Sequence, residues 1–154
     1  MTLNDTTGLA PLVKTVTVPT TPDRAFYLFT AEMSAWWPLV THSVGEQDAR
    51  RIEIGEGVGA RLVEYGDDGP LGVWGTVSVW DPPNAVAFSW HPGTDPAQAT
   101  QVSVTFTAVA EGTEVVLTHT DWYRRPDGVR ARTGYVTGWD HVLGRFVAAS
   151  SSRP

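Results

Sequence analysis

Residues Thr113–His119 (TEVVLTH) and Tyr135–Leu143 (YVTGWDHVL) have two different hydrophobic periods. In the first, Val115, Leu117 and His119 alternate with a more polar set, which is the period of a strand with one buried face. In the second, apolar residues recur at steps of three and four, which predicts a helix with one apolar side. Together they predict a sheet whose buried face packs against a long helix.

The period of two continues upstream of these residues. It predicts strands at about residues 13–18, 50–54, 58–65, 71–81, 85–91, 100–109 and 113–121, separated by turns rich in Gly, Pro, Asn and Asp. Most of these links are short, which favours antiparallel neighbours. The predicted order is strand, helix, six strands and a long helix, and periodicity alone leaves other α+β topologies open.

Two helices are predicted from their start signals. Thr21-Pro22-Asp23 predicts the start of the first, with Thr21 as N-cap and Pro22 at the first helical position. Pro126-Asp127-Gly128 predicts the start of the second, which is expected to end near Ala149. The apolar face of the first helix is expected to consist of Phe26, Phe29 and Met33.

Three glycines, Gly134, Gly138 and Gly144, lie inside the long helix. Each destabilises a helix by about 1 kcal/mol relative to Ala, so their presence needs a reason. Gly138, next to Trp139, would let the helix approach the sheet or a ligand closely. The ordinary explanation is that glycine makes room for core aromatic residues such as Trp74 or Trp90.

The chain has the length of one domain. We expect residues 11–149 to form this domain, residues 1–10 to be a loose tail and residues 150–154 to be a frayed tail. Neither an internal repeat nor a second domain is indicated.

The composition disfavours several classes of protein. With 17 Asp and Glu against 11 Lys and Arg, the net charge is −6, which disfavours nucleic-acid binding because that needs clustered cations. The absence of Cys excludes disulfides, thiolate nucleophiles and Cys-based zinc sites. No stretch approaches the roughly 20 apolar residues of a membrane span. The first residues lack the pattern of a signal peptide, so a cytoplasmic location is expected.

Five short sequence motifs along the chain each contain an aromatic residue or a histidine: Ala35–Pro38 (AWWP), Gly75–Pro83 (GTVSVWDPP), Val86–Trp90 (VAFSW), Thr113–His119 and Tyr135–Leu143. From about Leu12 to Ala148 the sequence resembles the family named after the activator of the heat-shock-protein-90 ATPase, within the START-like (SRPBCC) polyketide-cyclase superfamily. The resemblance implies an α+β helix-grip fold: a curled seven-stranded antiparallel sheet around a long C-terminal helix, with a short N-terminal helical segment. It also implies an interior cavity for a small ligand.

Strand alternation assigns side chains to the two faces of the sheet. We expect Phe88 and Trp90 to face inward, His91 to face outward, and His119 to face inward with Asp121 near the rim. Seven Trp exceed what a small core needs, which indicates an aromatic cage for a flat or apolar ligand. The alternative is a packed core with a small cavity. The expected ligand-binding residues are Trp36, Trp37, Trp74, Phe88, Trp90, His119, Tyr135 and Trp139.

Two roles are open for His119. In a catalytic role it acts as a general base oriented by Asp121, with Tyr135 as a further polar group. In a structural role it is a hydrogen-bonded wall residue. The four histidines, His42, His91, His119 and His141, do not have metal-ligand spacing, so we expect neither a metal nor another cofactor.

Three functions remain open. The first is a START-like domain that binds a hydrophobic or aromatic small molecule without catalysis. The second is an aromatase/cyclase-like enzyme that acts on a polyketide-type substrate in the same cavity. The third is an accessory factor of a chaperone ATPase, although the eukaryotic activator has a separate N-terminal domain without a counterpart in this sequence. The fold does not decide among these functions, and self-association is left open.

Overall fold

In the computed structural model, which describes residues 8–151, seven strands form one antiparallel sheet in the order β1-β7-β6-β5-β4-β3-β2. Successive strands from β2 to β7 are hydrogen-bonded neighbours, and β1 joins the sheet beside β7. The predicted seven-stranded antiparallel sheet is therefore confirmed. The strands are β1 (Leu12–Val18), β2 (Arg51–Ile54), β3 (Arg61–Gly66), β4 (Gly69–Asp81), β5 (Ala85–Trp90), β6 (Thr100–Val109) and β7 (Gly112–Thr120).

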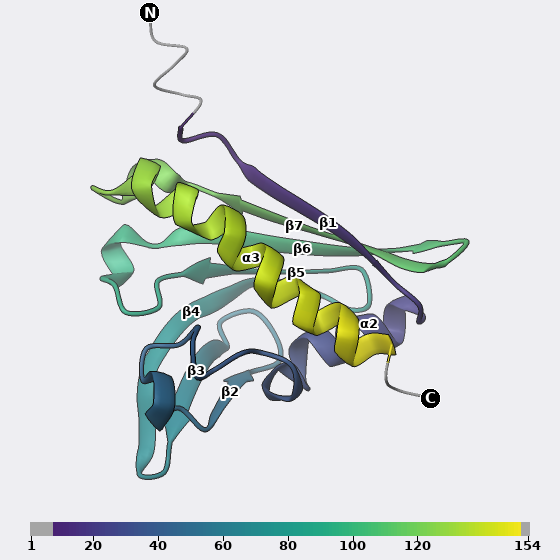
Figure 1. The fold of residues 1–154 in the computed structure, drawn as a ribbon, viewed down its shortest axis with the longest axis horizontal. Helices are drawn as coiled ribbons and strands as arrows, with labels where there is room; N and C mark the ends of the chain where they lie inside the picture. Colours follow the sequence, from purple (N-terminus) through teal and green to yellow (C-terminus); the bar gives the residue numbers. More distant parts are fainter. Residues whose placement is uncertain (1–7, 152–154) are drawn as a thin grey trace, which may run out of the picture.

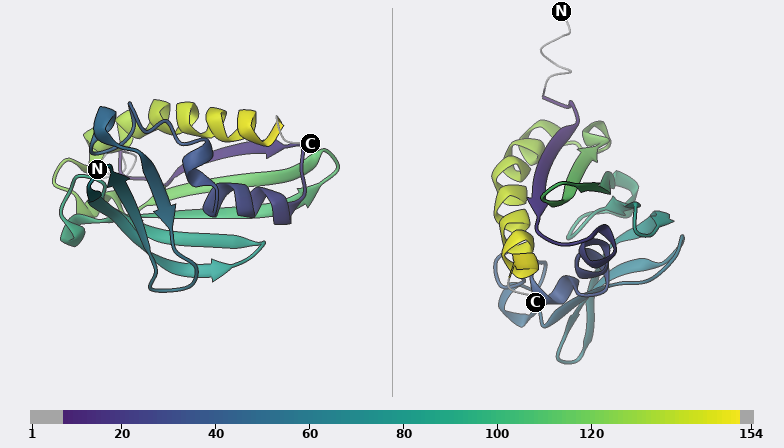
Figure 2. Two further views of the ribbon diagram at one scale, coloured as in Figure 1. Left: turned by 90° about the horizontal axis from the view of Figure 1, so that it is seen from below. Right: turned by 90° about the vertical axis from the view of Figure 1, so that its right-hand side faces the viewer.

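Two α-helices, α2 (Pro22–Thr30) and α3 (Gly128–Ser151), lie on the same side of the sheet. The long helix α3 crosses the sheet diagonally (Figure 1), and the sheet curves around the side on which both helices lie (Figure 2). This is the helix-grip arrangement. In the described part of the chain, four short 3₁₀ helices accompany them: η1 (Met33–Ala35), η2 (Glu46–Asp48), η3 (Pro96–Gln98) and η4 (Trp122–Arg124).

The predicted start of α2 is confirmed. The Thr21 hydroxyl accepts a hydrogen bond from the backbone N–H of Arg24 at 3.3 Å, which satisfies one of the free N–H groups at the helix start. The helix ends at Thr30, however, so Met33 lies in η1 rather than on the same helix as Phe26. The predicted apolar face is therefore divided between two elements, although its members are all buried.

The end of α3 corrects the predicted C-terminal tail. The helix runs to Ser151, two residues past its expected end. Ser150 is buried and its hydroxyl donates to the Val147 carbonyl at 2.7 Å, so it belongs to the helix rather than to a frayed tail. Residues 1–7 and 152–154, the larger parts of the two predicted tails, lie outside the described residues.

The sheet bends where β4 passes β5. A register shift between Val77 and Val79 marks a β-bulge, which increases the local twist. At Gly75 an added Cβ would lie 1.7 Å from the Ser89 carbonyl oxygen, so only glycine lets the two strands approach this closely. The approach brings the rings of Trp74 and Trp90 together, with centroids 5.6 Å apart.

The core lies between the concave face of the sheet and the two helices. Phe88, Trp90 and His119 are buried there, as strand alternation predicts. The prediction that His91 faces outward is wrong, because His91 is only 7% exposed. Strand β5 ends at Trp90, so strand alternation does not extend to His91, although its backbone N–H still donates to the Trp74 carbonyl of β4 at 2.6 Å.

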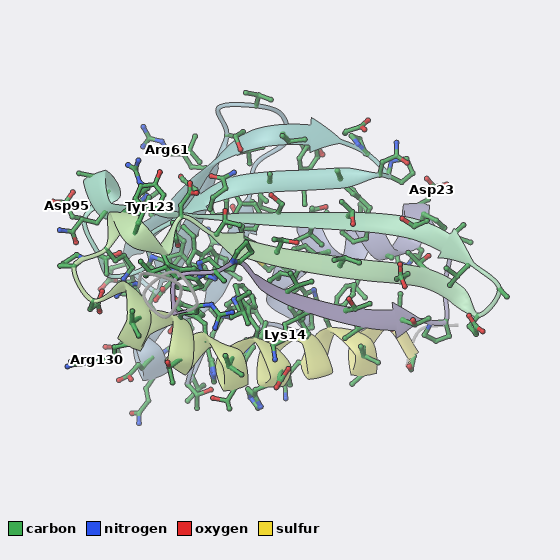
Figure 3. The ribbon with its side chains drawn as sticks, turned by 90° about the horizontal axis from the view of Figure 1, so that it is seen from above. Lys14, Asp23, Arg61, Asp95, Tyr123 and Arg130 are labelled. Carbon is green, nitrogen blue, oxygen red and sulfur yellow. The ribbon has the colours of Figure 1, made fainter. Side chains whose placement is uncertain are left out.

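Charged side chains lie mainly on the outer surface. Lys14 stands where β1 meets α3, and its Nζ lies 2.9 Å from Oδ1 of Asp140 (Figure 3). In the same view Asp95 and Tyr123 lie at one end of the sheet and Asp23 lies at the other.

Within residues 8–151, no helix is both long and apolar enough to cross a membrane.

Candidate functional site

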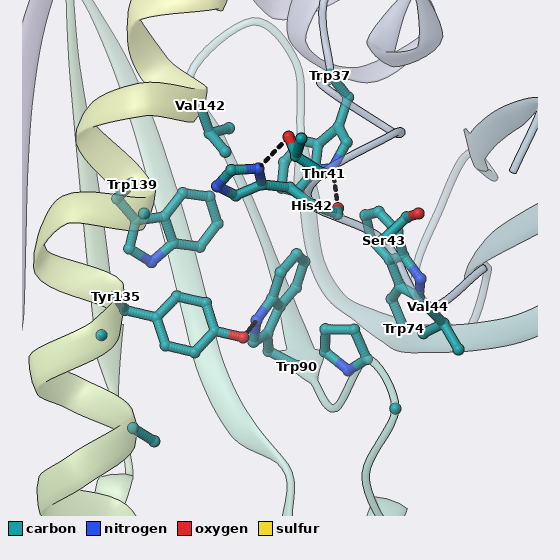
Figure 4. A pocket seen from close by; sticks show the side chains of 15 residues that line it. Trp37, Thr41, His42, Ser43, Val44, Trp74, Trp90, Tyr135, Trp139 and Val142 are labelled. Atoms are coloured by element: carbon teal, nitrogen blue, oxygen red, sulfur yellow. Dashed lines mark hydrogen bonds between the residues drawn. The ribbon is translucent and has the colours of Figure 1, made fainter. Parts of the chain in front are cut away.

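A cavity of about 510 Å³ lies between α3 and the strands that carry Trp74 and Trp90 (Figure 4). On the side away from α3 it is lined by residues of the segment Thr41–Gly45, called the mouth loop below, and by Pro92 and Gly93 after β5. The residues that line the cavity are Trp37, Thr41, His42, Ser43, Val44, Trp74, Trp90, Pro92, Gly93, Ala131, Gly134, Tyr135, Gly138, Trp139 and Val142.

One wall of the cavity is a single face of α3. Its lining residues recur at steps of three and four along the helix, from Ala131 to Val142. An added Cβ would meet nothing within 4 Å at Gly134 or at Gly138. The expectation that these glycines make room for core aromatic residues is therefore wrong. Their missing side chains leave open space, and that space belongs to the cavity.

The other wall is aromatic. The ring of Trp37 lies 5.1 Å from that of Trp74 and 5.9 Å from that of Trp90, measured between centroids. Trp90 in turn lies 5.4 Å from Trp139, which joins the sheet wall to α3. Their tilted and edge-on arrangement is favourable for aromatic rings and fixes the shape of the wall.

Tyr135 carries one of the polar groups that reach the cavity. Its phenolic oxygen accepts a hydrogen bond from Nε1 of Trp90 at 2.9 Å (Figure 4). Within residues 8–151 no acceptor binds the phenolic proton, so that proton is available to a molecule in the cavity. Burial raises the pKa of Tyr135 above its ordinary value, which keeps the group a neutral donor.

His42 is the second polar group, and it stands on the mouth loop. Its Nδ1 lies 2.7 Å from the Thr41 hydroxyl, and its ring stacks on that of His141 with centroids 4.9 Å apart and planes at 25°. Burial, and secondarily the neighbouring His141, lowers the pKa of His42. The imidazole is therefore neutral at neutral pH and links the mouth loop to α3.

His119 lies behind the aromatic wall instead of in the cavity. It is fully buried; its Nδ1 accepts from Nε1 of Trp139 at 3.0 Å and its Nε2 lies 2.7 Å from the Thr100 hydroxyl. An indole N–H can only donate, so Nδ1 is unprotonated and the proton of the neutral ring is on Nε2. Burial lowers the pKa of His119 to about 3, and the positive charge of Arg125 contributes.

The structure brings together most, but not all, of the expected ligand-binding residues. Trp37, Trp74, Trp90, Tyr135 and Trp139 line the cavity. Trp36, Phe88 and His119 are buried behind it and do not line it.

Asp121 does not orient His119. Strand β7 ends at Thr120, and Asp121 has a left-handed backbone with φ of 67°. The strand alternation that would place its carboxylate beside the imidazole therefore stops before it, and both ring nitrogens of His119 have other partners. The predicted pair of a general base and its orienting carboxylate is not formed.

Sequence reasoning missed the mouth loop and Glu64, whose carboxylate accepts hydrogen bonds from the backbone N–H groups of Val44 and Gly45. His42 lies in a segment without regular periodicity, so no pattern indicated its position. Glu64 did leave a signal, because it shares the inward face of β3 with Leu62, and a carboxylate on such a face needs partners. Within residues 8–151, no three His, Asp or Glu side chains gather in a way that could hold a metal ion.

Comparisons with known proteins agree with this fold. A protein-family model described as Activator of Hsp90 ATPase homolog 1-like protein matches residues 19–150. No curated protein sequence matches the chain. The MLL2253 protein of Mesorhizobium loti is 20% identical with a TM-score of 0.66, over 94% of this chain and 100% of that one.

Two further solved structures carry descriptive names. The Aha1 dimer of Colwellia psychrerythraea is 18% identical with a TM-score of 0.64, over 91% of this chain and 95% of that one. The protein Txn09, described as an anthrahydroquino-γ-pyrone synthase, is 26% identical with a TM-score of 0.60, over 90% of this chain and 95% of that one. Since the family model spans most of the sequence and the helix-grip fold agrees with it, this chain belongs to the family of activator of Hsp90 ATPase homolog 1-like proteins, among the START-like proteins.

Proposed function

We propose that this chain binds a flat, uncharged aromatic molecule that carries a hydrogen-bond acceptor. The observation that carries the proposal is the cavity of about 510 Å³, which has an aromatic wall on the sheet side and two side-chain-free positions, Gly134 and Gly138, on the helix side. Its volume falls within the roughly 300–1,000 Å³ of small-molecule sites in proteins.

The shape of the cavity favours a flat ligand. Trp37, Trp74 and Trp90 present ring faces and edges, against which another aromatic ring packs well. Opposite them, Gly134 and Gly138 expose bare helix backbone, so a planar molecule can lie close to α3. A branched or bulky aliphatic molecule would fill such a slot less completely.

The polar groups specify the rest of the ligand. Among residues 8–151, no Lys, Arg, Asp or Glu lines the cavity, so a strongly charged ligand would lose its hydration without gaining a partner. The free phenolic proton of Tyr135 requires an acceptor such as a carbonyl oxygen. A flat aromatic ketone satisfies both requirements.

The test is a titration with anthraquinone, a flat diketone, compared with a long-chain fatty acid. Binding beside four indoles should quench tryptophan fluorescence, and at a hundred times the dissociation constant it should add about 2.7 kcal/mol to the free energy of unfolding. We expect anthraquinone to bind and the fatty acid to bind more weakly. If neither molecule, nor any flat ketone in a wider panel, raises the melting temperature, the cavity is not a site for this class of ligand.

A second candidate, catalysis in the same cavity, is favoured by the 26% identity to a protein described as a synthase. The group that would act is the neutral imidazole of His42, which lines the cavity and has a lowered pKa. If the chain is an enzyme, His42→Gln should lower turnover of an identified substrate by about 10²–10⁴ and leave substrate binding nearly unchanged. If turnover persists in that variant, His42 is not the base.

A further inference from the structure

Glu64 is a fully buried carboxylate on β3. Burying a charge is unfavourable unless hydrogen bonds replace its hydration shell. Within residues 8–151, Glu64 takes part in no ion pair. Its stability in the interior therefore depends on neutral donors.

Three N–H groups supply those bonds. Oε1 accepts from the backbone N–H of Val44 and from Nε1 of Trp74, both at 2.8 Å, and Oε2 accepts from the backbone N–H of Gly45 at 2.7 Å. Two of these donors belong to the mouth loop and the third to the aromatic wall. Val44 and Trp74 both line the cavity. One carboxylate thus connects the mouth of the cavity to its wall.

The mouth loop is shaped to reach this carboxylate. An added Cβ on Gly45 would lie 2.5 Å from Leu71 Cδ1 and 3.0 Å from Glu64 Oε2, so a side chain there would displace the Leu71 side chain and disturb the Glu64 carboxylate. Nearer its start the loop is held by the indole N–H of Trp37, which donates to the His42 carbonyl at 2.7 Å. The loop is therefore fixed on both sides of the residues that form the mouth.

We propose that Glu64 is a positioning residue of this pocket, which holds the mouth loop and Trp74 in the geometry that retains a ligand. The inference rests on the proposed function, since it concerns the same cavity. A ligand leaving past the mouth loop has to displace residues whose backbone N–H groups are bound to Glu64. Loss of the carboxylate then speeds dissociation more than it slows association.

The chemistry of the site requires a carboxylate and excludes its amide. Both oxygens of Glu64 face N–H donors, so the group has to accept at both positions. A glutamine has one accepting oxygen, and its NH₂ group would face another donor. With the oxygen kept on the Val44 and Trp74 side, the bond to Gly45 is lost and the loop is released.

The decisive variant is Glu64→Gln, with Glu53→Gln as its control. Glu53, on neighbouring β2, is half-exposed and pairs with Arg51 at the surface, so the same chemical change is made outside the pocket. We expect the anthraquinone dissociation rate, measured by stopped-flow tryptophan fluorescence, to rise at least about tenfold in Glu64→Gln. In Glu53→Gln it should stay within about twofold.

A second readout does not depend on any ligand. Hydrogen exchange of the Val44 and Gly45 amides in the free protein should become at least about tenfold faster in Glu64→Gln, since both amides lose or weaken their acceptor. Gly45→Ala, which leaves Glu64 intact, should change both readouts in the same direction. It also serves as the test if Glu64→Gln fails to fold.

The outcomes separate this inference from the proposed function. If wild type does not bind anthraquinone or any other flat ketone but the amides exchange faster, the proposed function fails while Glu64 still holds the loop. If wild type binds a flat ketone, and both variants keep its dissociation rate and the amide exchange within about twofold of wild type, the inference is overturned. A lower melting temperature with an unchanged dissociation rate overturns it as well, because Glu64 is then structural only.

Discussion

The indole N–H of Trp139 donates to Nδ1 of His119 at 3.0 Å, and this bond determines what the histidine can do. A protonated imidazole would present an N–H at Nδ1, where it would face the N–H of the indole. The pKa of His119 is about 3, so the ring is neutral through the physiological range. His119 therefore supports Trp139 from behind, and Trp139 forms part of the cavity wall.

Because of His119, the free energy of unfolding should decrease as the pH is lowered. The group has a pKa of about 3 when folded and about 6.5 when unfolded, so between these values only the unfolded chain binds the proton. The contribution of His119 to the free energy of unfolding is complete above pH 6.5. As the pH falls below that value, it is lost by about 1.4 kcal/mol per pH unit. Urea denaturation at pH 7.5 and pH 5.0 should show a loss of about 2 kcal/mol from this residue.

The variant His119→Gln isolates that contribution and should show a shallower loss between the two pH values. An equal loss in both proteins would mean that other groups produce it. At neutral pH the variant should lose about 1–3 kcal/mol, because the glutamine amide has a different shape and cannot keep both buried hydrogen bonds of the imidazole, to Trp139 and to Thr100. In a Trp139→Phe background, which has no indole N–H donor, the same substitution should cost less.

His119→Gln should nevertheless keep the affinity for anthraquinone within about tenfold, since the residue lies behind the wall and does not line the cavity. Fluorescence titration measures this. A complete loss of binding in a folded variant would show that ligand binding depends on the hydrogen bond between His119 and Trp139, although His119 does not line the cavity.

Gly138→Ala should raise the stability of the protein and weaken ligand binding. Alanine improves the helix by about 1 kcal/mol, and its Cβ meets no protein atom within 4 Å, so the melting temperature should rise. The same methyl group enters the cavity and should weaken anthraquinone binding at least about tenfold. Gly144→Ala is the matched control, because that exposed glycine lies outside the cavity lining. It should raise the melting temperature equally without weakening binding.

Tyr135→Phe tests the predicted hydrogen bond to the ligand. Without the phenolic proton, the affinity for anthraquinone should fall by about fivefold to tenfold, corresponding to about 1 kcal/mol. Anthracene has the same ring system without carbonyl oxygens, so its affinity should change much less. Equal losses for the two molecules would indicate that the substitution disturbs the wall through Trp90 instead.

The sheet and the long helix were predictable because their residues follow regular periods. Alternation in β7 placed Leu117 and His119 inward, and the three-to-four spacing after Tyr135 marked the face of α3 that packs on the sheet. Such patterns follow from the geometry of a single strand or helix, so they can be recognised from a short stretch of sequence. The prediction failed where a strand ends, as at His91 and Asp121, because the period ends there too.

The cavity mouth was not predictable from periodicity. The contacts that fix it join distant segments: Glu64 binds Val44, and His42 stacks on His141 almost a hundred residues away. The two partners of the His119 ring likewise come from β6 and α3. The inward position of Glu64 was visible in the alternation of β3, but its partners depend on where the chain folds back.

Acid should open the mouth of the cavity through the stacked pair of His42 and His141. The pKa of His42 is lowered by burial first and by His141 second, so near neutral pH the His42 ring is uncharged where it stacks on His141. As the pH falls below the lowered pKa of His42, its ring gains a charge that the partly buried stack against His141 disfavours, and this moves the mouth loop off α3. Anthraquinone does not titrate in this range, so its affinity should drop between pH 7.5 and pH 5.0 while near-ultraviolet circular dichroism reports an intact fold. His141→Gln removes the neighbour that helps to lower the pKa of His42, and the exposed position tolerates the change, so the drop in affinity should move to higher pH. An identical pH dependence in wild type and His141→Gln would show that the histidine pair does not control the mouth.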